Sequence, residues 1–444
     1  MEIKNIFEDE KKYRKARNRK YTPIKLFNFY ILLTLVISVF GPWEYAGYNK
    51  GYVVLYIIIF LSFSTMTYVY FVNKNKGITF VISKKNKANK KFKGLWVAKK
   101  SIFLALILFS AMLLIKITTI GLPEFSNVFR VMAQAYTNKY LTGSTFNLSA
   151  WLFNYLSIFY VGAIVLGSYF YRDLNKRYKT MLLLVVALSL AYHLIFVGNQ
   201  KAIGDLIIFL GSVLFVKYAQ SGKRIKFKVI LLVLFGVLCS FLLFSYIIQS
   251  RMSLWNVEYY SIGNKAFLDI NHWMLALFGN NIKLGAGTFL YYLSSGYYGL
   301  SLALELPFVW SYGFGSSFEL RYLFNKLVPL TDEFIQSYPI RMEAQTGWDA
   351  YANWHTIFPW LASDFTFWGA IIFLCTFIAI YAVSWNRILR KGHWVNLLMF
   401  ANLNIMLLYV PANNQLFQTR ASLLVTLIIT ILWIFNYNYI GDEI

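Results

Sequence analysis

The residues best suited to chemistry lie in one long connection, residues 249 to 356, between strongly apolar segments. Three of them are arginines: Arg251, Arg321 and Arg341. Arginine keeps its charge at any working pH, and its planar fork matches the oxygens of phosphate or carboxylate. A phosphorylated lipid headgroup is therefore a natural ligand. The alternative is a salt bridge for each, and Glu319 and Glu343 stand two residues from Arg321 and Arg341 as available partners.

A second group of polar residues lies in GWDAYANWHTIFPWLASDFTFWGA, residues 347 to 370. Here Asp349, Asn353, His355 and Asp364 are interleaved with tryptophans and tyrosines. A histidine can act as general base or acid near neutral pH, and aromatic faces beside Asn, Asp and His suit a sugar ring. The alternatives are a structural histidine and ordinary aromatic residues of the membrane interface. If His355 is structural, the base becomes Asp349 or Asp364.

The turn GNQKAIGD, residues 198 to 205, joins two apolar segments and carries Asn199, Lys201 and Asp205. Lys201 and Asp205 are spaced to pair on a helix. The functional alternative is that this turn brings Asn199 and Lys201 into the same cavity as the long connection, since a charge near membrane depth is a candidate for function.

Several other classes of site are excluded by absent motifs. The sequence has no GxSxG, HExxH, DxD or glycine-rich phosphate loop. Both cysteines, Cys239 and Cys375, fall in apolar segments, where a thiol acts as a small hydrophobe. We therefore expect no metal, no cofactor and no disulfide.

The elements that must position these residues are membrane spans. The chain has 444 residues, is 58% hydrophobic and 14% charged, and carries repeated apolar runs close to the roughly 20 residues that cross a bilayer. The sequence predicts an all-α polytopic membrane protein with about ten (10–12) transmembrane helices in a single domain, 26–444, after a basic N-terminus, 1–25. The ten predicted spans are 26–40, 52–72, 101–120, 150–170, 181–198, 203–219, 228–248, 357–384, 394–412 and 421–440.

The net charge of +24 is clustered in alternate connections. Lysine and arginine concentrate in 1–25, 73–100, 171–180, 217–228 and 385–393, and are sparser in 41–51, 121–149, 199–202, 249–356 and 413–420. By the positive-inside rule the first group and both termini are cytoplasmic and the second group is outside. Nucleic acid is not expected as a partner, because the basic residues are clustered in connections beside the apolar spans and are not spread along one face.

The stretch 285–308, GAGTFLYYLSSGYYGLSLALELPF, is ambiguous. A single crossing there would place the basic cluster 385–393 outside. The stretch is therefore expected to stay on the outer side, to dip in and return, or to cross together with a second segment. The large extracytoplasmic loop would then contain re-entrant or short helices, and glycine and serine would permit a re-entrant path lining a cavity.

Taken together, these features resemble a known family. GNQKAIGD opening a span, YYLSSGYYGLSLAL after it, and the run Asn353, Thr356, Asp364, Phe365 and Gly369 before the next span resemble the O-antigen and capsular repeat-unit polymerases, the Wzy type. The similarity covers about residues 190 to 420. Family members often carry Arg where this chain has Lys201, and a tighter Asp-Phe-Gly where it has DFTFWG.

The resemblance implies a metal-independent glycosyltransferase of the bacterial inner (plasma) membrane. It would polymerise undecaprenyl-pyrophosphate-linked oligosaccharide repeat units at the outer leaflet for surface polysaccharide, with a chain-length regulator and a flippase as partners besides the lipid bilayer. We expect His355, Asp349 and Asp364 as catalytic candidates. The expected substrate-binding residues are Arg251, Arg321, Arg341, Lys201, Asn199, Tyr292 and Asn353. A glycan ligase and a polysaccharide transporter or flippase remain the alternatives.

Overall fold

The computed structural model describes residues 19–74, 84–122, 131, 135, 147–221, single helical positions between 231 and 246, 261–262, 264–328, 336–391 and 393–441. Within these residues, seven helices are long and apolar enough to cross a membrane. They are α2 (Thr22–Phe40), α3 (Lys50–Lys74), α4 (Lys84–Ile120), α6 (Leu148–Gly162) continued by the π-helical turn η2 (Ala163–Gly167), α7 (Lys176–Ala191) continued by the π-helical turn η4 (Tyr192–Phe196), α8 (Lys201–Ser221) and α14 (Ile357–Lys391).

Two shorter apolar helices complete the described bundle, α15 (Trp394–Leu408) and α16 (Arg420–Gly441). The all-α fold and nine of the ten predicted spans therefore have a helical counterpart. Span 228–248 falls mostly outside the described residues, so the count of ten remains a prediction. The first helix begins at Thr22, four residues before the predicted start, with Pro23 in the first turn, where a missing N–H costs nothing.

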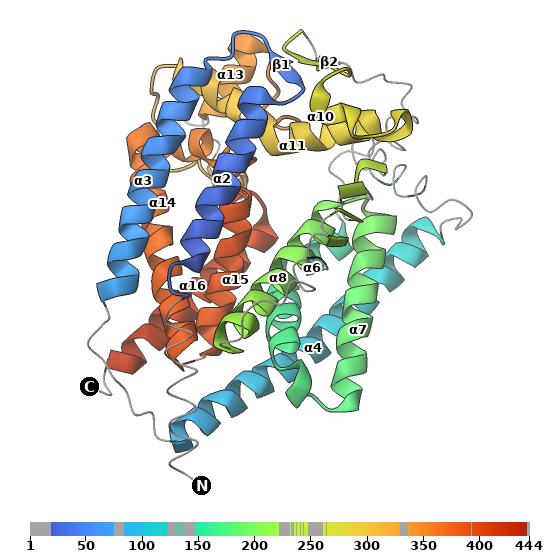
Figure 1. Ribbon diagram of the computed structural model, residues 1–444. Helices are drawn as coiled ribbons and strands as arrows, with labels where there is room; N and C mark the ends of the chain where they lie inside the picture. Colours follow the sequence, from blue (N-terminus) through green and yellow to red (C-terminus); the bar gives the residue numbers. More distant parts are fainter. Residues whose placement is uncertain are drawn as a thin grey trace.

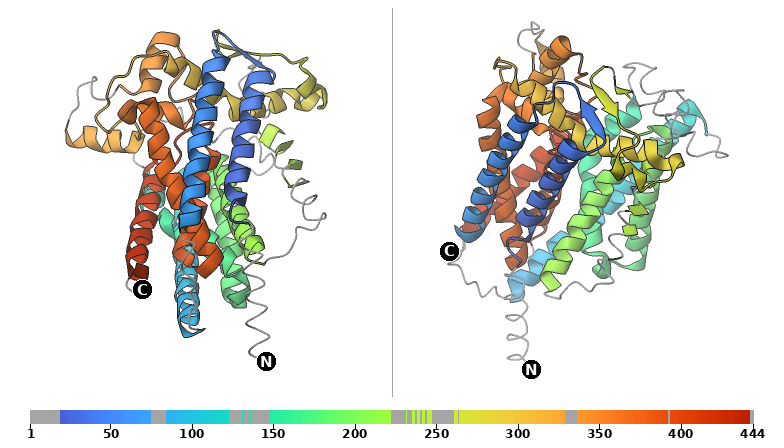
Figure 2. Two further views of the ribbon diagram at one scale, coloured as in Figure 1. Left: turned by 60° about the vertical axis from the view of Figure 1, so that its left-hand side comes forward. Right: turned by 45° about the horizontal axis from the view of Figure 1, so that its top comes forward.

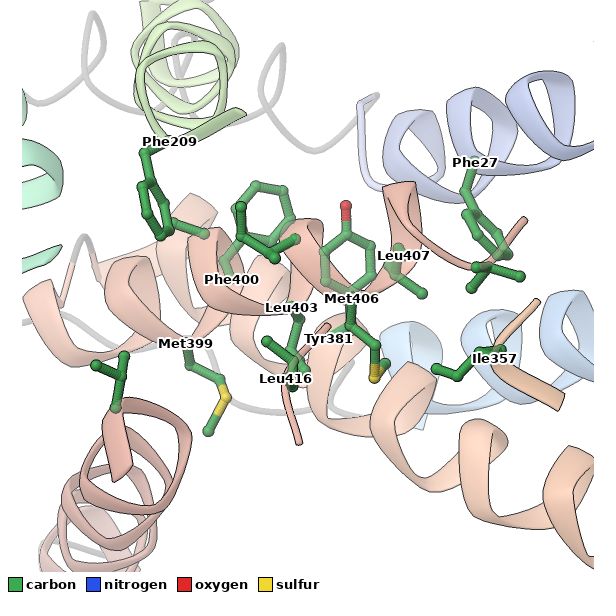
Figure 3. Packing of buried hydrophobic residues seen from close by; sticks show 14 of the residues in the cluster. Phe27, Phe209, Ile357, Tyr381, Met399, Phe400, Leu403, Met406, Leu407 and Leu416 are labelled. Carbon is green, nitrogen blue, oxygen red and sulfur yellow. The ribbon is translucent and has the colours of Figure 1, made fainter. Parts of the chain in front are cut away.

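The centre of the bundle is α15. Twelve of its fifteen residues are buried, as expected for a helix that is apolar all round. Figure 3 shows Met399, Phe400, Leu403, Met406 and Leu407 from this helix packed between Phe209 of α8 and Phe27 of α2. Large apolar side chains on the outside of the bundle are exposed instead, among them Phe29 (66%), Met66 (69%) and Ile372 (70%). An apolar exterior of this kind suits lipid rather than water.

Asparagines of α15 fix it to three neighbours. Asn402 donates to Thr426 of α16, Asn404 donates to Ser212 of α8 and accepts from Tyr381 of α14. Hydrogen bonds between helices in an apolar surrounding specify which helices pack together.

The outer connections meet at one end of the bundle. The short strand β1 (Trp43–Tyr45), which follows α2, pairs antiparallel with β3 (Ala266–Leu268), and β3 pairs with β2 (Ser261–Ile262). Trp43–Tyr45 belongs to the connection 41–51 and the other two strands to the long connection. Both were predicted to lie on the same side, and the sheet confirms that they do.

The basic connections meet at the opposite end. The indole of Trp385 donates to the carbonyl of Arg19, whose guanidinium donates to the Tyr218 hydroxyl, and Asn386 donates to the carbonyl of Val72. In Figure 1 the start of α2 and the end of α16 lie at this lower end, and the sheet lies at the upper end. We call the end with the sheet the outer end.

The long connection forms a helical cap at the outer end. Its helices are α10 (Trp273–Ala276), α11 (Asn280–Leu304), α12 (Phe318–Leu327) and α13 (Tyr338–Thr346). Figure 1 shows α11 lying across α2 and α3 rather than beside them. The ambiguous stretch 285–308 is therefore one regular helix over most of its length, in place of the irregular re-entrant path considered from its glycines and serines.

The orientation of the bundle can be tested by labelling. In a Cys239→Ser, Cys375→Ser background, we expect Leu277→Cys, at an outer-end position that is 80% exposed, to react with a membrane-impermeant maleimide in intact cells. Arg177→Cys, at an exposed position of the basic connection 171–180, should react only after permeabilisation, because that connection is cytoplasmic by the charge rule. If Arg177→Cys reacted in intact cells and Leu277→Cys did not, the orientation of the bundle would be the reverse of the predicted one.

Candidate functional site

The candidate site is built around a turn, residues 409–419, that follows the short helix α15. The backbone N–H of His355 donates to the carbonyl of Ala412 (3.1 Å), that of Ile357 donates to the carbonyl of Val410 (3.0 Å), and the Tyr30 hydroxyl donates to the carbonyl of Leu408 (2.7 Å). These bonds supply partners for non-helical backbone inside the bundle, which must be satisfied by protein when no water is present. The turn thereby holds the segment 347–356 in place.

Two glycines let α11 pack against this turn and against the segment 347–356. A Cβ atom on Gly296 would lie 2.0 Å from the carbonyl oxygen of Pro411, and one on Gly299 would lie 2.7 Å from the carbonyl oxygen of Trp354. Three residues apart, they share one face of the helix and permit contact of backbone with backbone. This contact is the structural reason for the glycines in YYLSSGYYGL.

His355 is enclosed at the centre of this contact. It is 1% exposed, and its Nε2 has no hydrogen-bond partner among the described residues. Burial lowers the pKa of His355 to about 3, because an imidazolium there would be desolvated. The side chain is therefore neutral at physiological pH and closed to solvent, as in the structural alternative. Its expected role as general base stays a prediction that this geometry does not favour.

Asp364 anchors the loop 311–316, SYGFGS. Its Oδ1 accepts from the Ser311 hydroxyl (2.6 Å) and from the backbone N–H groups of Gly313 (2.9 Å) and Gly315 (3.2 Å), and its Oδ2 accepts from the N–H of Ser316 (2.7 Å). Positive φ at Tyr312 (53°) and Gly313 (88°) turns these N–H groups inward to form an anion-binding nest. The Asp364 carboxylate thus has a clear structural task.

The break that follows Asp364 divides α14. Thr366 has φ 62° and ψ 169°, and its hydroxyl accepts from the N–H of Gly369 (3.3 Å). The run Asp364, Phe365, Gly369 therefore marks the junction between a short buried helix and a long span.

Asp349 is the most accessible of the three catalytic candidates. It is half-buried, and its Oδ1 accepts from the N–H groups of Tyr351 and Ala352, both at 2.7 Å. Tyr351 is 63% exposed, and its hydroxyl accepts from Arg321 Nη2 at 2.9 Å. The turn after α13 thus brings together a carboxylate, a guanidinium and an aromatic face at the outer surface.

Asn353, Tyr292 and Trp354 form the neighbouring part of the site. Asn353 Oδ1 accepts from the hydroxyl of Tyr291 of α11 (2.8 Å), and the Tyr292 and Trp354 ring centres are 6.0 Å apart. Of the aromatics expected to face a sugar, Trp348 and Trp360 are only 1% exposed and belong to the core. Trp368 is 62% exposed but belongs to the long span of α14. Tyr351 and Trp354 therefore remain as candidate sugar-facing rings in the segment 347–356.

Arg341 is buried without an acidic partner among the described residues. It is 9% exposed, its Nη1 donates to the carbonyl of Pro307 (3.0 Å), and its guanidinium carbon lies 4.7 Å from the centre of the Tyr338 ring. Its Nε and Nη2 are buried and have no hydrogen-bond partner within hydrogen-bonding geometry among the described residues. Glu343, the partner considered from the sequence, instead accepts from the N–H of Ala350 (3.1 Å). Burial lowers the pKa of Arg341, which still stays charged at any working pH.

Lys201 and Asn199 make the local structural contacts that the spacing of the turn 198–205 allows. Lys201 Nζ pairs with Asp205 Oδ2 at 2.5 Å, and Asn199 Oδ1 accepts from the N–H of Lys201 at the start of α8. Lys201 also lies 5.3 Å from the ring centre of Tyr409, the first residue of the central turn. The turn 198–205 therefore approaches the central turn 409–419 with its lysine already paired, and its expected place beside the long connection stays a prediction.

Sequence reasoning missed Arg420, the first residue of α16. Arg420 Nε donates to Glu319 Oε1 at 2.5 Å, so Glu319 is not the partner of Arg321. Arg420 Nη1 also donates to the Tyr155 hydroxyl of α6 (3.3 Å). The available signal was a lone arginine at the outer end of the last apolar segment, opposite a loop richer in acids than in bases. Arg251 lies outside the described residues.

The buried state of His355 has a measurable consequence. Because its folded pKa is lowered from 6.5 to about 3, the unfolded chain binds a proton in this range and the folded chain does not. The free energy of unfolding is therefore not reduced by His355 above pH 6.5, and it decreases as the pH falls from 6.5 towards 3. We expect the melting temperature of the purified protein to fall more steeply between pH 7 and pH 4.5 than that of His355→Gln. Equal slopes for both proteins would contradict a neutral buried His355.

The described residues hold no group of three or more His, Cys, Asp or Glu side chains placed to bind a metal ion. The loop 347–356 contacts both Arg321, through Tyr351, and α13, through the bond from Ala350 to Glu343.

The chain matches no protein-family model, no curated protein and no solved structure.

Proposed function

We propose that the chain is a membrane glycosyltransferase that polymerises lipid-linked oligosaccharide repeat units for surface polysaccharide. Its donor is a glycan on undecaprenyl pyrophosphate, and its acceptor is a single repeat unit on a second such carrier. The enzyme lies in the bacterial plasma membrane with both termini in the cytoplasm, so its outer end faces the outer leaflet. The resemblance in GNQKAIGD and YYLSSGYYGLSLAL motivates the proposal.

The observation that carries it is Arg341. A buried charge without an opposite charge is costly, and such a group is retained where an anion compensates it. Arg341 keeps two N–H groups, Nε and Nη2, without partners. Both groups are closed to solvent, so the donor must displace part of their cover, which includes the Tyr338 ring, to reach them. They lie on one side of the guanidinium and can then bind two oxygens of a phosphate together. We assign Arg341 to the pyrophosphate of the donor.

The chemistry places two demands on the protein. A hydroxyl of the acceptor sugar attacks the anomeric carbon of the donor, the bond from that carbon to the pyrophosphate oxygen breaks, and the hydroxyl proton passes to a base. Charge develops on the leaving pyrophosphate, and stabilising such charge is commonly the largest contribution to catalysis. Arg341 serves that task.

The base is assigned to Asp349. Among the three candidates, His355 is enclosed, and both oxygens of Asp364 already accept hydrogen bonds from the loop 311–316. Asp349 uses one oxygen for its turn and is half-buried at the outer surface. Tyr351, Trp354 and Asn353 lie in the same segment and suit the faces and hydroxyls of the sugar.

The role of Arg341 can be tested in cells. A strain lacking the gene is complemented with wild type, Arg341→Lys or the exposed control Arg177→Lys, and surface glycan is separated on a gel. We expect Arg341→Lys to collapse the ladder to a single repeat unit, since lysine cannot replace a bidentate guanidinium and the loss of one such donor costs roughly 10²-fold in rate. Arg177→Lys should restore the ladder at equal protein level.

The outcomes also separate the alternatives. A full ladder with Arg341→Lys would remove Arg341 from the pyrophosphate site. Loss of all attached glycan, with the ladder of lipid-linked polymer intact, would mean a ligase. Failure of lipid-linked units to reach the outer leaflet would mean a flippase.

The role of Asp349 needs the purified protein and synthetic lipid-linked repeat units in excess EDTA. We expect wild type to polymerise, Asp349→Asn to lose about 10² to 10⁴-fold in turnover with donor binding retained, and His355→Gln to stay within a few fold. Full activity of Asp349→Asn would move the base elsewhere, and loss of wild-type activity in EDTA would refute a metal-free reaction.

A further inference from the structure

The helix α12 carries an apolar stripe on its exposed side. Leu320, Leu323, Phe324 and Leu327 follow the spacing i, i+3, i+4, i+7, which places them on one face of a helix. Their side chains are 40%, 37%, 39% and 78% exposed, and no residue of α12 is buried. One side of the Phe324 ring packs against Phe314 of the preceding loop, with ring centres 4.5 Å apart. Val328, directly after the helix, is also 50% exposed.

The first turn of α12 is attached to the protein, whereas Tyr322, Asn325 and Lys326 on the side away from the stripe are exposed. Glu319 binds Arg420 of α16, and Arg321 donates to Tyr351. Phe318, in the same turn, packs against Trp360 with ring centres 5.0 Å apart. The preceding Ser317 donates its hydroxyl to the carbonyl of Phe417, which ties the start of the helix to the central turn. A helix covering a water-soluble core would have the reverse arrangement, with its leucines inward.

The surroundings of the stripe belong to the lipid-facing exterior. In the left view of Figure 2, α12 is the gold helix beside a short grey trace, and it lies across the spans near their outer ends. Trp368 and Ile372 of α14 are 62% and 70% exposed, and the loop before α12 exposes Trp310 (52%) and Tyr312 (49%). Exposed tryptophan and tyrosine at this height are typical of the boundary between headgroups and acyl chains.

We infer that α12 is an interfacial helix whose Leu320, Leu323, Phe324 and Leu327 face inserts into the outer leaflet of the bilayer. The occupant of this face is lipid because the stripe follows a loop with exposed Trp310 and Tyr312 at the outer end of a bundle whose exterior is apolar. The first turn of the helix supplies an ion pair and a hydrogen bond to the outer end of the protein. Amphipathic helices of this kind lie in the plane of the interface with their apolar side among the acyl chains. This assignment does not depend on the proposed glycosyl transfer.

The test uses the full chain in liposomes of phosphatidylethanolamine and phosphatidylglycerol. In the Cys239→Ser, Cys375→Ser background, an environment-sensitive nitrobenzoxadiazole label is attached at Leu323→Cys or Leu327→Cys on the stripe. Matched controls carry it at Asn325→Cys, on another face of the same helix, and at Tyr351→Cys, on the exposed turn. Nitroxide-bearing acyl chains report contact with lipid, and iodide reports contact with water.

We expect the two stripe positions to show blue-shifted emission, loss of fluorescence with nitroxide lipid and protection from iodide. Both controls should show the opposite. Quenching of the stripe labels by iodide, with no loss from nitroxide lipid, would place α12 in water and overturn the assignment. Protection from both quenchers would also overturn it: protection that disappears at a low ratio of protein to lipid would mean a second copy, and protection that persists would mean another segment of this chain.

Discussion

The outer half of this structure depends on the shortness of α15, which ends at Leu408, before it could cross a bilayer. With fifteen residues the helix is about 22 Å long, less than the roughly 30 Å of a hydrocarbon core. Because it is also the central helix, its end lies among other helices rather than at a water surface. The end of α15 and the turn 409–419 must therefore find partners for their peptide groups inside the protein. Tyr30 of α2 bonds to Leu408 at the helix end, and His355 of the segment 347–356 and Ile357 at the start of α14 bond to the turn. The position of the candidate site follows from this requirement.

The spans and the sorting of their connections were predictable because two simple signals determine them. Apolar length gives the helices, and alternating basic content gives the two ends of the bundle. The sequence did not predict the path of α11 or the break at Thr366. The path of α11 depends on close contact between backbones at Gly296 and Gly299. The break at Thr366 follows the Asp364 carboxylate, which is bound by the loop 311–316. Both interactions arise only after distant segments have packed.

At the site, the residue types were easier to predict than their partners. Lys201 and Asp205 are four residues apart on a helix and pair as that spacing allows. Glu319 and Arg321, like Arg341 and Glu343, are two residues apart on helices, and side chains at that spacing point in different directions. The partner of Glu319 is Arg420, and the partner of Glu343 is the N–H of Ala350; both come from other elements. Local spacing could therefore exclude the neighbouring pairs, although it could not supply the distant ones.

The small sheet has a consequence for how the molecule is made. Of the seven long apolar helices among the described residues, six precede β3 in the chain, whereas β1 directly follows the first of them. During synthesis Trp43–Tyr45 is therefore made early and has no strand to pair with until the chain between β1 and β3 has been made. Trp43 likewise has its indole bonded to the carbonyl of Gly287, which is made still later. Closure of the outer cap is thus a late step of biogenesis, and a chain truncated before β3 would leave both the strand edge and this tryptophan without their native partners.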